Sequence, residues 1–152
     1  MTVPLGRCVM SDAREINDML FDAVNGHDMD EIMDCYQEDA VLVTPAGISE
    51  GREQISWYYQ HLLTGFPDLH VTAWHKVLCD EPAMSEWTMT GTHTGPFLVP
   101  DGSVAEGTGR KIIIRGCGAC SIDDGRIITH RDYYDQLELY NQIGFCLETE
   151  PV

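Results

Sequence analysis

The stretch Gly125 to Asp135, G-R-I-I-T-H-R-D-Y-Y-D, is predicted to be the return strand of a β-hairpin. It follows the turn residues Asp123-Asp124-Gly125, and a β-branched run precedes that turn. Side chains alternate between the two faces of a strand. One predicted face carries Ile128, His130, Asp132 and Tyr134, and the other carries Ile127, Thr129, Arg131 and Tyr133. Because one face must look into the protein, at least one ionisable group is expected in a sheltered place, where it must be paired, hydrogen-bonded or used.

The partner strand of this hairpin, 111–122, contains Gly116 and Gly118, and glycine weakens a strand. Two explanations are open. The glycines allow a β-bulge that curves the sheet, or they leave volume in which a ligand lies against the backbone. Cys117 and Cys120 are three residues apart, and in a strand such a pair points to opposite faces. We therefore do not expect this pair to bind a metal or to act as a redox couple.

The chain changes from helical to alternating periodicity near Leu69. Apolar spacing predicts three helices: one over about 12–24 with Ser11 as N-cap, a short one after Asp28, and one over about 52–63. A short strand is predicted at 40–43, before the third helix. After that helix we expect strands over 69–78 and 83–94, then the hairpin, and a brief closing segment after Asp135. Helices followed by hairpin-linked strands favour an α+β fold, in which about three N-terminal helices pack on one face of a curved antiparallel sheet. We expect a flexible leader at 1–10, a single domain at 11–147 and a tail at 148–152.

The composition narrows the class of protein. With 152 residues, of which 43% are hydrophobic, the chain can form one globular domain with its own core. A formal charge of −16 opposes binding to nucleic acid and to anionic membranes, so neither is expected as a partner. Six cysteines scattered through apolar segments, with no secretory segment before them, predict a reduced, cytoplasmic location.

The hairpin carries the strongest candidate for an acid or base. Asp132 lies in the middle of its strand, on the same face as His130 and Tyr134. The alternative is that Asp132 is a surface residue paired with Arg131 or Arg115. His130 is either a structural hydrogen-bonding residue or a helper of Asp132.

A second set of candidates lies earlier in the chain. His93 stands between Gly91 and Gly95 near a strand end, where it could exchange a proton at neutral pH. The large side chains Trp57, Tyr58, Tyr59, Trp87 and Met89 either line an apolar pocket for a flat ligand or belong to the core. We expect no metal and no cofactor. The sequence has no second Cys or His cluster with zinc spacing, no phosphate-binding glycine loop and no dinucleotide fingerprint.

A family resemblance runs from about Ile16 to Gly144. It is carried by A-V-N-G at 23–26, E-D-A-V at 38–41, G-R-E-Q-I at 51–55, F-P-D-L at 66–69, E-W-T-M-T-G-T-H-T-G-P-F at 86–97, T-G-R-K at 108–111, D-G-R-I at 124–127 and H-R-D-Y-Y-D at 130–135. With these motifs the chain resembles the SnoaL-like polyketide cyclases, within the nuclear transport factor 2-like superfamily. The resemblance implies a cone-shaped α+β barrel that encloses a deep pocket. It also implies a homo-oligomer, either a dimer or a tetramer.

The resemblance also assigns roles to residues. In ring-closing members the aspartate of the H-R-D motif is the acid/base, and this position is Asp132 here. These members carry a histidine fourteen residues earlier, where this chain has Gly118. That change leaves volume beside Asp132 and removes a proton partner, which His93 or His130 could replace. Pocket positions that tune stereochemistry in relatives fall on Val24 and Tyr58.

These observations together predict a cofactor-independent cyclase or isomerase of secondary metabolism. Its substrate would be a polyketide-like, apolar and polyoxygenated molecule, with Asp132 moving a proton and His93 as the opposing acid. The expected substrate-binding residues are Val24, Trp57, Tyr58, Trp87, Met89, Gly118 and Tyr134. Two alternatives stay open: a cofactor-free hydroxylase or epoxide-opening enzyme on the same scaffold, and a non-catalytic small-molecule-binding module.

Overall fold

The structure is a computed structural model that describes residues 13–76 and 81–146. Its elements are α1 (Ala13–Asn25), α2 (Met29–Asp34), β1 (Tyr36–Thr44), β2 (Gly47–Glu50), α3 (Gly51–Gly65), β3 (His70–Lys76), β4 (Ala83–Thr92), β5 (Phe97–Leu98), β6 (Val104–Ala105), β7 (Lys111–Asp123), β8 (Arg126–Tyr134) and α4 (Gln136–Gln142). The expected Ser11 cap and the expected boundaries of the leader and tail lie outside the described residues.

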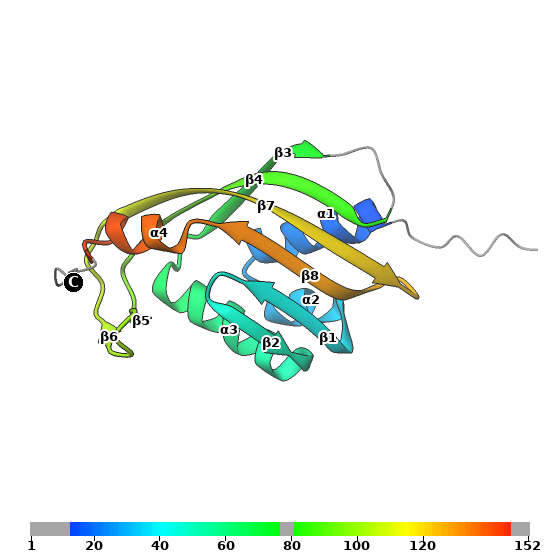
Figure 1. Cartoon of the computed structure of the whole chain (residues 1–152), viewed down its shortest axis with the longest axis horizontal. Coiled ribbons are helices and arrows are strands. Elements are labelled where there is room, and N and C mark those ends of the chain that lie inside the picture. The colour runs from blue at the N-terminus through cyan, green and yellow to red at the C-terminus, as the bar shows by residue number, and fades with distance from the viewer. Residues whose placement is uncertain (1–12, 77–80, 147–152) are drawn as a thin grey trace, which may run out of the picture.

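Six strands form one curved sheet in the order β2-β1-β8-β7-β4-β3. Neighbouring strands are antiparallel except β1 and β8, which run parallel. The sheet curves around α1, α2 and α3, which lie on its concave side, while α4 lies beyond the end of β8 (Figure 1). The predicted α+β fold, with three N-terminal helices on one face of a curved sheet, is therefore confirmed. The four-residue β2 and the two-residue strands β5 and β6 were not predicted, because they are too short to show alternation.

Local sequence explains where the helices begin and which face they bury. The Asp28 carboxylate accepts hydrogen bonds from the backbone N–H groups of Asp30 and Glu31, both at 3.1 Å, and so caps α2. Asp135 caps α4 in the same way, through the N–H of Glu138 at 3.0 Å. On α1 the buried residues recur at helical spacing and face the sheet: Ile16, Asn17, Leu20, Ala23 and Val24.

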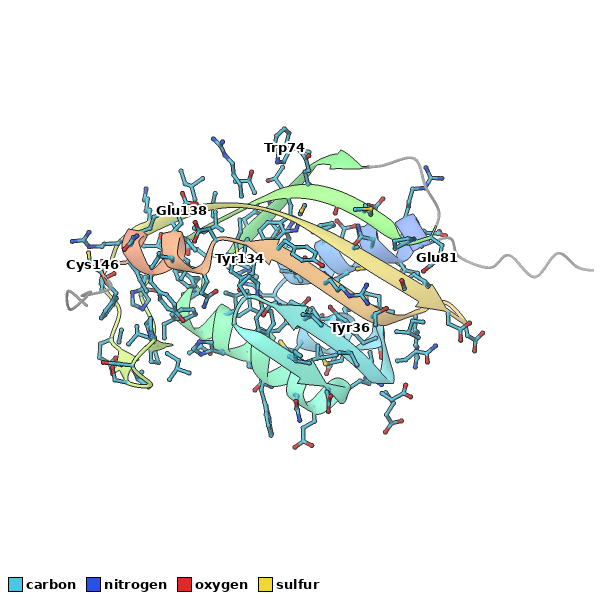
Figure 2. All side chains as sticks on the ribbon, in the orientation of Figure 1. Tyr36, Trp74, Glu81, Tyr134, Glu138 and Cys146 are labelled. Atoms are coloured by element: carbon cyan, nitrogen blue, oxygen red, sulfur yellow. The ribbon has the colours of Figure 1, made fainter. Side chains whose placement is uncertain are left out.

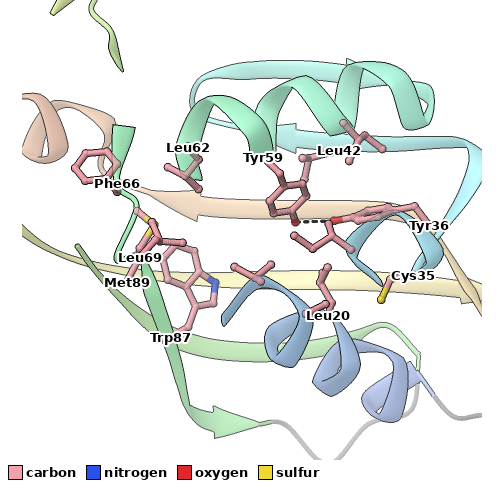
Figure 3. Packing of buried hydrophobic residues seen from close by; sticks show 14 of the residues in the cluster. Leu20, Cys35, Tyr36, Leu42, Tyr59, Leu62, Phe66, Leu69, Trp87 and Met89 are labelled. Carbon is pink, nitrogen blue, oxygen red and sulfur yellow. Dashed lines mark hydrogen bonds between the residues drawn. The ribbon is translucent and has the colours of Figure 1, made fainter. Parts of the chain in front are cut away.

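The core fills the space between these helices and the concave face of the sheet (Figure 3). Its large, fully buried members include Tyr36, Ile55, Phe66 and Ile114. On the other side of the sheet large apolar side chains are exposed, and Trp74 points outward from β3 (Figure 2). No helix in the described part of the chain is long and apolar enough to cross a membrane.

A bulge in the hairpin alters the face that was predicted for β8. The register between β7 and β8 shifts between Ser121 and Ile122, which leaves one extra residue on β8. Ile127 is fully buried and Ile128 is 37% exposed, so Ile128 does not share the inner face with His130. Further along β8, the inner face carries His130, Asp132 and Tyr134, as predicted.

The two glycines of β7 do not form this bulge. Gly116 and Gly118 pair in continuous register with β4 on one side and with β8 on the other. The first of the two explanations for these glycines is therefore wrong. The reason for them lies in the side chains that occupy the space above them.

Candidate active site

Three neighbouring strands place a row of short side chains across the concave face. Asp132 of β8 is directly opposite Gly118 of β7, and Gly118 is directly opposite Ser85 of β4. In the adjacent row Trp87, Gly116 and Tyr134 are aligned in the same manner. A Cβ at position 118 would overlap Oδ1 of Asp132, and a Cβ at position 116 would lie 2.5 Å from the Trp87 ring. Both glycines are thus required by large or charged neighbours on the inner face.

A small cavity of about 50 Å³ lies over this row, between the sheet and helices α1 and α3. It is lined by Asn17, Leu20, Phe21, Val24, Tyr59, Ser85, Trp87, Gly118, His130 and Asp132. We call it the inner cavity. A space of this size has room for a few water molecules. The inner cavity can therefore admit a reacting group but not a whole polyketide.

Asp132 is paired with a buried histidine in the wall of the inner cavity. Nε2 of His130 lies 3.1 Å from Oδ1 of Asp132, and the two side chains are 7% and 16% exposed. Burial alone would lower the pKa of His130, but the negative charge of Asp132, together with Cys120 and hydrogen bonds to both residues, holds that pKa well above its usual range. The histidine is therefore charged at neutral pH, and it holds one carboxylate oxygen in place.

Two tyrosines extend this pair into a hydrogen-bonded chain. Nδ1 of His130 lies 2.6 Å from the Tyr36 hydroxyl, which lies 2.8 Å from the Tyr59 hydroxyl (Figure 3). With both ring nitrogens protonated, Nε2–H donates to Asp132 and Nδ1–H donates to Tyr36. Burial raises the pKa of both tyrosines well above the usual value, so they are neutral hydroxyls. Both ring nitrogens of His130 and both tyrosine hydroxyls therefore have a partner, which is the condition for burying such groups.

A larger outer cavity of about 380 Å³ lies beside the inner one, between α3 and the segments around α4 and β5. Its aromatic lining includes Trp57, Tyr58, His61, Phe97, Tyr134 and Tyr140. The Tyr58 and Tyr134 hydroxyls are 3.4 Å apart, and the rings of Tyr134 and Trp87 are 6.0 Å apart. Because Tyr134 contacts Trp87 of the inner cavity and Tyr58 of the outer cavity, this tyrosine pair lies between the two cavities.

The structure distributes the predicted site residues over these two cavities. Val24, Trp87, Gly118, His130 and Asp132 line the inner cavity, and Trp57, Tyr58 and Tyr134 line the outer one. Trp57 is 58% exposed and therefore lies at the rim. Met89 is buried in the hydrophobic core and lines neither cavity. Met89 is therefore a core residue, which was the second of the two interpretations of the large apolar side chains.

The structure does not bring His93 to Asp132. Eight residues of chain separate His93 from Ser85, which marks the row of Asp132, and this corresponds to roughly 26 Å along a strand. His93 is fully buried between the rings of Phe66 and Phe97, and its Nδ1 lies 3.0 Å from the Thr108 hydroxyl. Burial lowers its pKa, so it is neutral at pH 7. As the opposing acid His93 is out of reach, and His130 occupies the position beside the carboxylate.

Three polar residues of the site were not identified from the sequence: Asn17, Tyr36 and Ser85. Tyr36 meets His130 through the parallel pairing of β1 with β8, which no local pattern indicates. Asn17 gave the clearest available signal, because it is a polar residue on the apolar face of an amphipathic helix.

Metal-binding side chains do not converge in the described part of the chain. Within residues 13–76 and 81–146 no three His, Cys, Asp or Glu side chains are arranged to hold an ion. Cys117 is exposed and Cys120 is buried, so the pair points to opposite faces as predicted. The site therefore consists of carboxylate, imidazole, hydroxyl and amide groups.

The fold is that of a ketosteroid isomerase-like α+β domain. A hypothetical protein from Catenulispora acidiphila with a ketosteroid isomerase-like fold matches with a TM-score of 0.72 and 19% identity, over 90% of this chain and 98% of its own. A candidate SnoaL-like polyketide cyclase from Jannaschia sp. CCS1 matches with a TM-score of 0.75 and 24% identity, over 86% and 90% of the two chains. AclR, a candidate hydroxylase from Streptomyces galilaeus, matches with a TM-score of 0.75 and 20% identity, over 89% and 97%.

The family follows from the sequence match. The model of the SnoaL-like polyketide cyclase family matches residues 14–143, and the chain belongs to this family. No curated protein matches the sequence. The resemblance that the motifs indicated is therefore confirmed, and it supports a polyketide-related enzyme.

Proposed function

We propose that the protein is a cofactor-independent cyclase or isomerase that removes a proton from a carbon next to a carbonyl group in a polyketide-like substrate. The observation that carries the proposal is the Asp132 carboxylate in the wall of a sheltered cavity, held by the charged His130 at 3.1 Å. A fixed carboxylate within a closed, largely apolar site is suited to act as a general base. Family membership supports the same class of reaction.

His130 is assigned the role of orienting the base. Its Nε2–H binds Oδ1 of Asp132, which leaves Oδ2 as the oxygen to accept a proton from substrate. Tyr36 fixes the imidazole from the other side through Nδ1. This arrangement holds the carboxylate before the substrate arrives, and such preorganisation lowers the barrier to proton transfer.

The sizes of the two cavities indicate how a substrate would bind. The inner cavity of about 50 Å³ can hold only the reacting carbon and its carbonyl group, whereas the outer cavity of about 380 Å³ can hold flat rings. The aromatic lining of the outer cavity suits an aromatic or polyoxygenated substrate. For a substrate to occupy both cavities at once, the side chains of Tyr58 and Tyr134 must separate. Their hydroxyls are 3.4 Å apart, which is a long and therefore weak hydrogen bond.

Cofactor-free hydroxylation is a second candidate. It is favoured by the likeness of the fold to AclR, a candidate hydroxylase, and it would begin with the same proton removal by Asp132. Oxygen uptake during turnover separates hydroxylation from cyclisation. The expected homo-oligomer stays a prediction, which sedimentation of the purified chain would test.

The proposal is tested by hydrogen–deuterium exchange at the α-carbon of uncharged aromatic ketones. The probes are 1-tetralone, 2-tetralone and 1-indanone, and their exchange is followed by NMR in deuterated buffer. We expect the wild-type protein to accelerate exchange of at least one ketone, and Asp132→Asn to lower the rate about 100-fold or more. The matched control is Asp124→Asn, the same change in the exposed hairpin turn, where the rate should not change. The proposal would be refuted if the wild-type protein accelerated exchange of none of the three ketones, or if the Asp132→Asn variant were fully active.

A further inference from the structure

Two buried polar side chains face Asp132 from the opposite side of the inner cavity. Ser85 is 4% exposed and Asn17 is 5% exposed, and both line the cavity. Neither has a role in the proton transfer proposed above. Buried polar groups normally have well-formed hydrogen bonds, so the contacts of these two side chains indicate what they can bind.

The contacts that Asn17 makes orient its amide but leave its donors weakly engaged. The Cys120 thiol donates to Oδ1 of Asn17 at 3.4 Å, and this fixes Nδ2 on the side of Ser85. Nδ2 then lies 3.5 Å from the Ser85 hydroxyl oxygen, at the long limit for a hydrogen bond. An amide nitrogen carries two N–H groups. A ligand oxygen in the cavity could therefore gain a better hydrogen bond from Asn17 than Ser85 now provides.

The register of the sheet fixes the spacing between these donors and the base. Ser85, Gly118 and Asp132 stand in one row across three strands, and adjacent strands are about 4.8 Å apart. Ser85 and Asp132 are thus roughly 10 Å apart at the backbone, and Oδ1 of Asp132 lies over Gly118 between them. A carbonyl group in the inner cavity would have its oxygen toward Asn17 and Ser85 and its α-hydrogen toward Asp132.

We infer that Asn17 and Ser85 bind the carbonyl oxygen of the substrate. The inference rests on the proposed function and adds the substrate class, an uncharged, enolisable ketone or ester. The donors are neutral, and no lysine or arginine is among the described residues that line either cavity. A carbonyl group is neutral in the ground state and gains negative charge only as the enolate forms.

The chemistry balances without a further reactant. Asp132 takes the α-proton, the C–H electron pair becomes the carbon–carbon double bond of the enolate, and the carbonyl π electrons move to the oxygen. Asn17 and Ser85 donate hydrogen bonds to that oxygen, which are strongest when the charge has developed. The proton on Asp132 then returns to carbon in an isomerisation, or passes to the oxygen of a second carbonyl that the enolate carbon attacks in a cyclisation.

The test uses Ser85→Ala and Asn17→Leu in the full-length protein, with the ketone that the wild type exchanges fastest. We expect kcat for exchange to fall about 10- to 100-fold in each variant while KM stays within about threefold, because the lost donors act mainly on the enolate. Ser121→Ala is the control, a serine-to-alanine change on β7 outside both cavities. If Asn17→Leu does not fold, as judged by circular dichroism, Ser85→Ala decides alone.

The outcomes separate this inference from the proposed function. If Ser85→Ala keeps the wild-type kcat while Asp132→Asn loses exchange, the base assignment stands and the inference is wrong. If Ser85→Ala raises KM without lowering kcat, Ser85 only binds the ground state and the inference is also wrong. Loss of kcat in Ser85→Ala but not in Ser121→Ala supports the inference.

Discussion

Replacing Gly118 with alanine tests the link between sequence, sheet register and the charged pair. The alanine Cβ would overlap Oδ1 of Asp132, the oxygen that His130 holds at 3.1 Å. The new Cβ would also lie 3.3 Å from the backbone oxygen of Arg131, which cannot move aside as a side chain can. The Asp132 side chain must therefore rotate away. No left-handed conformation is recorded at Gly118, so the backbone accepts alanine without strain. The variant therefore perturbs the charged pair and little else.

Two opposing contributions set the expected loss of stability. A hydrogen bond to a charged group contributes about 1.5–3 kcal/mol, and losing it destabilises the variant by roughly 2 kcal/mol. Glycine-to-alanine at a compatible backbone position returns about 0.4–1 kcal/mol through the unfolded chain. The net loss is about 1–1.5 kcal/mol, which corresponds to a fall in Tm of roughly 3–5 °C for a domain of this size.

The pH dependence of this loss follows from the direction of the His130 pKa. That pKa is raised in the folded protein, so the pair stabilises fully below the unfolded value of about 6.5, and its contribution is lost as pH rises through the folded pKa. We therefore expect Gly118→Ala to destabilise at about pH 6. At a pH above the folded pKa of His130 the imidazole is neutral in both proteins, so the difference should vanish or reverse slightly.

The assay is thermal unfolding of wild type and variant across this pH range, together with NMR titration of His130. Gly116→Ala is a matched control, because its Cβ would meet the uncharged Trp87 ring and should destabilise equally at both pH values. A loss of Tm in Gly118→Ala that does not change with pH, or an unchanged His130 pKa, would refute the reasoning. In the variant the His130 pKa should fall, since burial then acts without the nearby carboxylate.

Two further predictions concern residues farther from the base. Tyr134→Phe removes the 3.4 Å contact between the hydroxyls of Tyr134 and Tyr58, so less free energy should be needed to join the two cavities. KM for ketone exchange, measured by initial rates, should fall by up to about fivefold. An increase in KM would contradict the placement of this tyrosine pair between the two cavities. His93→Asn keeps an acceptor for Thr108 but loses the packing of the ring against Phe66. The free energy of unfolding in urea should therefore fall by about 1–2 kcal/mol, while kcat for exchange stays within about twofold. A large fall in kcat would show that His93 takes part in the reaction.

The sequence predicted most of the fold because its periodic segments are long. The apolar spacing of α1 and the alternation of β4 and β7 each extend over ten residues or more, so local pattern and burial agree. The parallel pairing of β1 with β8 was not predictable from such patterns, since pairing between distant strands leaves no local trace. The bulge at Ile128 was missed for a similar reason, because one extra residue inverts the faces without changing the composition.

The candidate site was predictable only in part. Asp132 stood out because a carboxylate on an inward strand face needs a partner, and the sequence left His130 and His93 open as that partner. The distance along β4 excludes His93, and only the three-dimensional structure reveals it. Asn17 and Ser85 come from α1 and β4, which are far apart in the chain, so spacing rules could not predict that they meet.

The most direct test of the account is a crystal structure of the Asp132→Asn variant with the exchange-active ketone bound. We predict that the ketone α-carbon lies within about 3.5 Å of the side chain at position 132, with the aromatic rings in the outer cavity and the carbonyl oxygen toward Asn17 and Ser85. A ketone held wholly within the outer cavity, or bound in the separate surface cavity beside Leu137 and Cys146, would contradict the central claim that Asp132 is the base.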